Sequence, residues 1–142
     1  MKNRGPNNSK IFTKKTNSKN IFFLHTRLSI LDLKKRSNQP FIYNNKVLIF
    51  NGEIYNFIEL KKEIQNNGYK FTTKSDTEVL IKGYDCYGSK IFDKMEGMWS
   101  LAIYDLKKNK LLLSRDRFGE KPLFFSRDRT GIYFGSETKF IE

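Results

Sequence analysis

The sequence has few of several residue types that define common classes of protein. It contains a single cysteine, Cys86, and a single histidine, His25. One cysteine excludes an internal disulfide framework, and one cysteine with one histidine cannot supply a Cys/His zinc site. No stretch approaches the eighteen or so consecutive apolar residues of a membrane span, and residues 1–4 lead into polar residues rather than an apolar signal core. These absences predict a cytoplasmic protein without a metal site.

Acidic residues are also scarce, with 15 Asp and Glu against 27 Lys and Arg and a formal net charge of +12. Such an excess attracts polyanions, so a nucleic-acid binder is one hypothesis. The pattern argues against it, because the lysines are scattered along predicted helices and loop tips. Neither zinc-finger spacing nor an aromatic RNP-like strand motif is present. We interpret the charge as a solvated, lysine-rich surface.

The composition is that of one folded domain. The chain has 142 residues, of which 38% are hydrophobic and 15% aromatic, and it shows no internal repeat. Residues 1–20 are polar and basic, and they predict a loop or a weakly ordered arm. Residues 21–142 are expected to form the domain.

In the first half of the chain, apolar patterns predict strands and one helix. The run Ile21–Leu24 is wholly apolar and predicts a buried strand. Residues 41–50 predict a hairpin around Asn44 and Asn45, which tolerate the positive φ of a tight turn. From Phe57 the apolar period changes to that of a surface helix, which we expect to end at Gly68.

In the second half, residues 69–71 alternate as in a short strand. Ser75 and Glu78 stand three apart, as in a capping box, ahead of a helix that we expect to end at Gly88. Cys86 lies near the end of that helix. We interpret it as a packing or surface thiol, since no second histidine exists to activate it.

A short helical piece over residues 91–95 precedes a series of strands. They are predicted at residues 98–105, 110–115, 122–126 and 131–135. Residues 101–104 and 111–113 are almost continuously apolar, which implies strands covered on both faces. The sequence therefore predicts an α+β fold of two packed antiparallel sheets with helices outside.

Five ordered blocks of the sequence closely resemble the glutaminase domain of glutamine-hydrolysing asparagine synthetases. They are His25-x-Arg27-Leu28-Ser29-Ile30-x-Asp32, Asn51-Gly52-Glu53-Ile54-Tyr55-Asn56, Ser75-Asp76-Thr77-Glu78, Gly97 to Asp105, and Arg115-Asp116-Arg117-x-Gly119-x-Lys121-Pro122-Leu123. Arg4-Gly5-Pro6 also resembles a family element. The glutaminase domains of amidophosphoribosyltransferases and glucosamine-phosphate synthases share the Asn-Gly and the later Asp. The residues 53–56 and 27–30 resemble the asparagine synthetase branch.

The resemblance implies a four-layer αββα sandwich of two antiparallel sheets, of the N-terminal-nucleophile class, here incomplete at its N-terminus. In that class an N-terminal cysteine attacks the side-chain amide of glutamine. The ammonia then passes to a separate ATP-using synthetase domain, which amidates aspartate. ATP and Mg are implied for that domain only, and no cofactor is implied in this chain.

The resemblance also implies a glutamine site. Arg27 would bind the α-carboxylate and Asp76 the α-ammonium, with Glu53 completing recognition of the amino end. Asn51 and the N–H of Gly52 would donate to the oxyanion formed on the attacked amide. The other implied substrate-binding residues are Leu28, Ile30 and Ser75. From the residues alone, Arg27 could be an ion-pair partner, Asp76 a first-turn acid and Glu53 a solvent-exposed carboxylate.

The nucleophile of the class is not found at the first residue, because Met1 is followed by Lys2. No Ser-Gly-Gly pyrophosphate loop is present either. We expect a partial domain, truncated at both ends and inactive as given, whose partners are L-glutamine and a synthetase domain or subunit, with a homodimer as a further option. The alternatives are a catalytically silent interaction module for a synthetase subunit, or amidation of another carboxylate such as a sugar acid.

Overall fold

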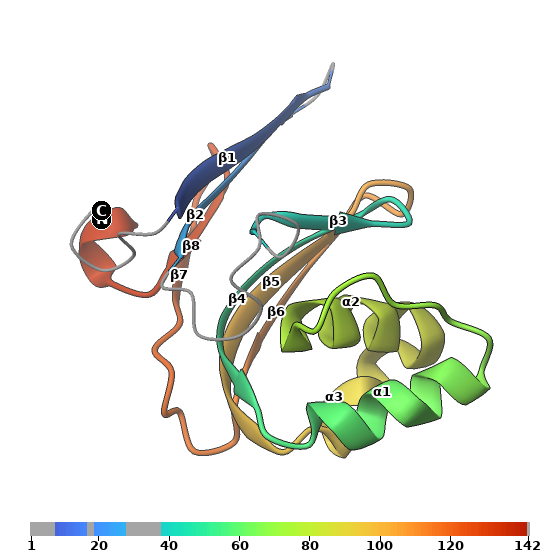
Figure 1. Cartoon of the computed structure of the whole chain (residues 1–142). Coiled ribbons are helices and arrows are strands. Elements are labelled where there is room, and N and C mark those ends of the chain that lie inside the picture. Colours follow the sequence, from blue (N-terminus) through green and yellow to red (C-terminus); the bar gives the residue numbers. More distant parts are fainter. Residues whose placement is uncertain (1–7, 17–18, 28–37, 142) are drawn as a thin grey trace.

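A computed structural model describes residues 8–16, 19–27 and 38–141 (Figure 1). Its central sheet is antiparallel, in the order β3-β4-β5-β6. These strands are β3 (Phe41–Tyr43), β4 (Lys46–Ile54), β5 (Gly97–Asp105) and β6 (Lys110–Arg115). The register places Phe50 opposite Leu101 and Gly52 opposite Trp99.

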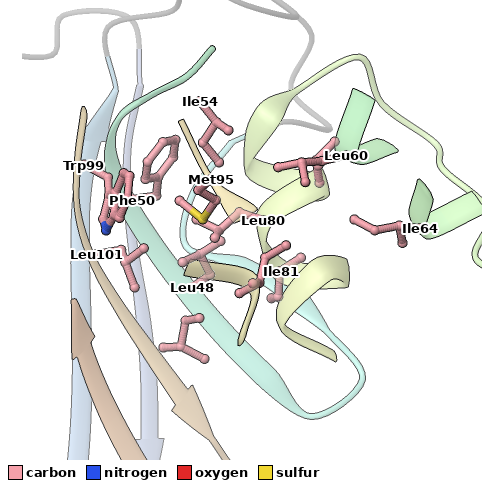
Figure 2. Close-up of a cluster of buried hydrophobic side chains, with 13 residues drawn as sticks. Leu48, Phe50, Ile54, Leu60, Ile64, Leu80, Ile81, Met95, Trp99 and Leu101 are labelled. Atoms are coloured by element: carbon pink, nitrogen blue, oxygen red, sulfur yellow. The ribbon is translucent and has the colours of Figure 1, made fainter. Parts of the chain in front are cut away.

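Three helices cover one face of the central sheet (Figure 1). They are α1 (Phe57–Asn66), α2 (Asp76–Tyr87) and α3 (Ile91–Lys94), with a 3-10 turn η3 (Gly88–Lys90) between the last two. Figure 2 shows the core between the two layers, in which Leu48, Phe50 and Leu101 of the sheet face Leu80 and Ile81 of α2. This core fixes the distance between β4 and the start of α2.

Two hairpins lie on the opposite face of the central sheet (Figure 1). One pairs β1 (Asn8–Lys15) with β2 (Asn20–Arg27), and the other pairs β7 (Phe124–Arg127) with β8 (Ile132–Gly135), before the 3-10 turn η4 (Thr138–Phe140). Ile21 and Phe23 of β2 pack against Ala102 and Tyr104 of β5. Strand β5 is therefore buried on both faces from Trp99 to Asp105, as its continuous apolar run predicts.

The α+β class with stacked antiparallel sheets is confirmed. The described residues form three layers: helices, the central sheet, and the pair of hairpins. Within them the α-helices all lie on one side of the central sheet, so the described residues form one helical layer and two sheet layers.

Local signals for turns and helix ends are confirmed. Asn44 and Asn45 have φ of 43° and 62° in the β3–β4 turn. Helix α1 ends ahead of Gly68, whose φ is 89°, and α2 ends at Gly88, whose φ is 60°. These left-handed conformations are the ones that glycine and asparagine adopt at least cost.

Two expectations are corrected. Within the predicted arm 1–20, Asn8–Lys15 forms strand β1. Its apolar residues are only Ile11 and Phe12, so no alternating pattern marks it; backbone pairing with β2 makes it a strand. Residues 69–71 form no strand and belong to the loop before α2. The N–H groups that follow, of Thr72 and Thr73, donate to the Glu78 carboxylate rather than to another strand.

Of the two hydrogen bonds of the predicted capping box, only the one accepted by Ser75 is formed. Ser75 is the N-cap of α2, and its Oγ accepts the Thr77 N–H at 3.1 Å. Glu78 does not reciprocate: its carboxylate binds Thr72, Thr73 and Lys82, while the Ser75 N–H donates to the Thr73 hydroxyl. Glu78 thus holds the loop that leads into the helix rather than the N-cap itself.

Candidate functional site

The Asn-Gly-Glu block forms the last part of β4, at the end that approaches α2. Asn51 is exposed, and Gly52 and Glu53 are half-buried. A Cβ on Gly52 would lie 2.1 Å from the main-chain oxygen of Met98 and 2.7 Å from the Cα of Trp99. Both atoms belong to the backbone of β5 and cannot move aside. Glycine is therefore required at this position by the close approach of β5.

Asp76, on the first turn of α2, reaches the same end of β4. Its side chain is 6% exposed, and its Oδ2 accepts the N–H of Ile54 at 3.3 Å. Burial raises the pKa of Asp76 above its ordinary value, and the nearby charge of Glu53 raises it further. Two neighbouring carboxylates create a negative potential that favours a cation, such as an ammonium group.

The backbone of β4 arranges these groups along one edge of the strand. The N–H of Phe50 donates to the Gln39 side chain, and the N–H of Ile54 donates to Asp76. In a strand, N–H groups two residues apart point to the same edge. The N–H of Gly52 therefore points to the edge between Gln39 and Asp76, about 7 Å along the strand from each of the other two donors at roughly 3.3 Å per residue.

Strand β3 does not cover this edge, because its pairing with β4 runs only from Tyr43↔Lys46 to Phe41↔Leu48. Beyond Leu48, side chains rather than a strand meet the described edge of β4. A strand edge lined by N–H groups and carboxylates can accept a ligand that carries both an oxygen acceptor and a cation. Asp76 and Glu53 lie close enough for their charges to interact, and the N–H of Gly52 points to the edge that Asp76 reaches. The joint role expected of Asn51, Gly52, Glu53 and Asp76 stays a prediction.

Ser75 is buried beside Asp76, and its hydroxyl is engaged as the N-cap of α2. Its demonstrated contact is therefore with the helix. The cap matters to the site, because it orients the first turn on which Asp76 sits.

Arg27 is the last residue of β2, where its backbone pairs with Asn8. Two residues earlier, the Nε2 of His25 lies 3.2 Å from the carbonyl oxygen of Phe50, so the end of β2 lies beside β4 just ahead of Asn51. The described residues include the backbone of Arg27 but not its side chain. Leu28 and Ile30 lie outside the described residues. The roles expected of these three residues stay predictions.

Two groups at the site were not singled out from the sequence. Gln39 is 6% exposed, and its side-chain amide binds both the N–H and the C=O of Phe50. The signal that could have found it is its place opposite Phe50 when the hairpin register is continued beyond Phe41↔Leu48. Thr77, whose hydroxyl lies 3.5 Å from the Gln39 Nε2, carries no such signal.

Asp116, from the last of the five blocks, supports the site from behind β5. It is 4% exposed and accepts four backbone N–H groups, those of Trp99, Phe118, Glu120 and Lys121. Burial raises the pKa of Asp116, but these hydrogen bonds outweigh it and hold the pKa below the ordinary value. Because Trp99 is the register partner of Gly52, the loop after β6 is tied to the strand behind the site.

Cys86 is half-buried near the C-terminal end of α2. It lies ten residues beyond Asp76, which is about 15 Å along a helix that rises 1.5 Å per residue. This distance agrees with a packing thiol rather than a nucleophile of the site.

Among the described residues, no group of three or more His, Cys, Asp or Glu side chains could hold a metal ion. In the same part of the chain, no helix has the length and apolar character needed to cross a membrane.

Sequence comparison identifies the class of domain to which this fold belongs. The family model for the glutamine amidotransferase domain matches residues 1–142. The chain belongs to this family.

Its relatives include the glutamine-hydrolysing asparagine synthetases, as the five sequence blocks predict. Asparagine synthetase (glutamine-hydrolysing) 1 of Bacillus subtilis is 39% identical over 140 residues, covering 97% of this chain and 21% of that protein. Asparagine synthetase B (glutamine-hydrolysing) of Escherichia coli is 39% identical over 145 residues, covering 99% of this chain and 25% of that protein. The chain therefore spans about a quarter of the length of the curated relatives it matches.

A solved structure supports the fold. Glutamine phosphoribosylpyrophosphate amidotransferase from Bacillus subtilis, in complex with ADP and GMP, superposes with a TM-score of 0.67 at 26% sequence identity. The match covers 82% of this chain and 27% of that one. The predicted fold class is thereby confirmed.

Proposed function

We propose that this chain is the glutaminase part of a glutamine-hydrolysing asparagine synthetase, which binds L-glutamine and releases its amide nitrogen as ammonia. The observation that carries the proposal is the edge of β4. A buried carboxylate with a raised pKa, Asp76, lies beside Glu53 at one end of it, and the N–H of Gly52 faces the same edge. The carboxylates suit the α-ammonium group of glutamine. The N–H of Gly52, about the length of a side chain away, suits the oxygen of its side-chain amide.

In this proposal Asp76 and Glu53 bind the α-ammonium, and Arg27 binds the α-carboxylate with its two-pronged guanidinium. Leu28, Ile30 and Ser75 line the substrate. Asn51 and the N–H of Gly52 donate to the amide oxygen, with bonds that strengthen as that oxygen becomes negatively charged. The strand holds the Gly52 donor in place before the substrate arrives, so no rearrangement cost falls on the reaction.

The attacking group would be the N-terminal cysteine that the family resemblance implies; residues 1–142 hold only Cys86 and do not include it. Its sulfur forms a bond to the amide carbon, the nitrogen takes a proton and leaves as ammonia, and water then hydrolyses the thioester to glutamate. The ammonia is used by an ATP-dependent synthetase domain or subunit, with aspartate as the acceptor. A cytoplasmic location and a homodimer stay predictions.

Isothermal titration calorimetry tests the substrate part of the proposal. We expect the chain to bind L-glutamine and to reject D-glutamine, whose charged groups cannot meet the same partners. Asp76→Asn should weaken L-glutamine binding by about 1.5 to 3 kcal/mol, the usual worth of a hydrogen bond to a charged group. Asp128→Asn, an exposed turn aspartate far along the sequence, is the matched control. Equal binding of the two enantiomers, or an unaffected Asp76→Asn variant, would overturn the proposal.

A further inference from the structure

Gln39 makes an unusual set of contacts for a buried side chain. Its Oε1 accepts the N–H of Phe50 at 2.6 Å, and its Nε2 donates to the carbonyl of the same residue at 3.0 Å. The side-chain amide thus binds Phe50 in the way a neighbouring strand binds a residue, with one donor and one acceptor. The two contacts also fix the orientation of the amide, because the opposite orientation would place donor against donor and acceptor against acceptor.

The position of Gln39 explains why a side chain is used. The β3–β4 register pairs Phe41 with Leu48, and its continuation would pair residue 39 with residue 50. The backbone pairing of β3 with β4 stops at Phe41 and does not reach residue 39. The amide of Gln39 replaces the missing backbone pairing at the residue that directly precedes Asn51.

A second donor holds the same carbonyl. The Nε2 of His25 lies 3.2 Å from the Phe50 oxygen, so this nitrogen carries the proton. The Phe50 carbonyl therefore receives hydrogen bonds from β2 and from Gln39. Because the peptide bond is planar, fixing this carbonyl also fixes the direction of the Asn51 N–H and the start of the Asn51-Gly52 segment.

Gln39 also touches the helix that carries Asp76. Its Nε2 lies 3.5 Å from the hydroxyl of Thr77, which is buried next to Asp76 on α2. One side chain thus contacts the residue before the oxyanion donors and the residue after the ammonium-binding carboxylate. A buried amide with all these partners is costly to leave unsatisfied, which makes its geometry strict.

From these contacts we infer that Gln39 is a positioning residue that sets the orientation of the Asn51-Gly52 donors and their spacing from Asp76. This inference rests on the proposed function for its substrate. It assigns Gln39 to the amide end of glutamine: Gln39 makes the site discriminate between ligands that carry a side-chain amide and ligands that share only the α-amino acid end.

The first arm of the test needs no ligand. Gln39→Met keeps the length of the side chain and removes both hydrogen bonds. We expect at least tenfold faster hydrogen exchange at the Phe50 amide and shifted backbone resonances for Asn51 and Gly52, with the rest of the sheet unchanged. Asn67→Ala is the matched control, since it removes an amide that binds Glu63 and Tyr87 away from the site. Unchanged Asn51 and Gly52 resonances in Gln39→Met would overturn the inference.

The second arm compares L-glutamine with L-norvaline, which has the same α-amino acid end and no amide. We expect at least a tenfold preference for L-glutamine in the unchanged protein. In Gln39→Met the preference should fall to about twofold or less, with L-norvaline affinity altered no more than about twofold. An equal loss for both ligands would show a general structural role and overturn the inference. Failure of the unchanged protein to bind L-glutamine would overturn the proposed function instead, and the first arm would still decide whether Gln39 positions the segment.

Discussion

The two faces of the central sheet are covered in different ways. On the helical face, Ile54, Ile64, Ile81 and Ile91 are fully buried, and large apolar side chains interlock. On the hairpin face, each hairpin is a separate two-stranded sheet, and several large apolar residues remain exposed. These are Ile11, Phe22, Leu24, Phe124, Phe125, Ile132 and Tyr133.

The two faces support the parts of the candidate site with different rigidity. Asp76 and the end of β4 belong to the well-packed helical side, whereas Arg27 ends a hairpin strand on the other side. A two-stranded hairpin is marginal on its own and depends on packing against a neighbour. We therefore expect Asp76 and the N–H of Gly52 to be held more firmly than the groups on β2.

The largest expected effect falls on the helical side, at the buried pair of Glu78 and Lys82. The two are 1% and 5% exposed and 2.6 Å apart, and Lys82 also lies over the rings of Tyr43 and Phe71. Glu78→Gln should reduce the free energy of unfolding by about 3 to 5 kcal/mol, because it leaves the Lys82 charge buried without its partner. Urea unfolding measures the loss, with the exposed Glu59→Gln as control.

The Glu78–Lys82 pair should also make the stability of the fold depend on pH in the acid range. Burial raises the pKa of Glu78, but the hydrogen bonds from Lys82 and from Thr73 and Thr72 outweigh it and lower the pKa to about 2. The contribution of Glu78 to stability is therefore complete above its ordinary value of 4.5 and is lost as the pH falls from 4.5 towards 2. The Glu78→Gln variant should lack this part of the acid sensitivity. An identical acid profile in both proteins would argue against the pair.

The next largest effect on stability is expected on the hairpin side, where two adjacent phenylalanines of β2 can be compared. Phe23 is 3% exposed and packs edge-on against Tyr104 and Phe134, whereas Phe22 is 67% exposed. Phe23→Ala should cost about 3 kcal/mol through the cavity it leaves. Phe22→Ala should change stability by no more than about 0.5 kcal/mol, and it should reduce aggregation. Equal costs for the two would mean that β2 does not pack as described.

The smallest expected effect is that of Asp76→Asn, which should raise the stability of the fold, whereas Glu78→Gln and Phe23→Ala should lower it. Its pKa is raised by burial and by Glu53, so the folded state binds its proton more tightly than the unfolded state. Stability therefore falls as the pH rises from the ordinary value of 3.8 through the raised value. Asp76→Asn should melt at a higher temperature than the unchanged chain at pH 7, while binding L-glutamine less well. The two proteins should melt alike below pH 3.8, and a less stable variant at pH 7 would contradict the raised pKa.

The raised pKa of Asp76 should also make the affinity for L-glutamine depend on pH. An ammonium group prefers the ionised form of Asp76, so we expect affinity to fall as the pH drops through the raised pKa. Calorimetry in buffers of different ionisation enthalpy should detect proton release on binding. A constant affinity over this range would place the ammonium away from Asp76.

Local chemistry made several elements predictable. Asn44 and Asn45 adopt positive φ without help from distant residues, and Ser75 caps α2 through a hydrogen bond two residues away. Strand β1 and the loop 69–71 were predicted wrongly for the converse reason. The backbone of β1 pairs with β2. The N–H of Tyr69 donates to the carbonyl of Ile64, and the carbonyl of Lys70 accepts from Lys82. Neither set of partners is visible in the segment itself.

The sequence by itself determined the family, the helix and turn boundaries and the polar blocks of the site, because each depends on residue identity or on neighbours a few positions away. Only the tertiary structure decided that Gln39 binds Phe50, that Glu78 holds the loop rather than the cap, and that the Gly52 N–H shares an edge with Asp76. These contacts join residues brought together by strand register and core packing. The register is set by the whole sheet, so a single segment cannot specify it.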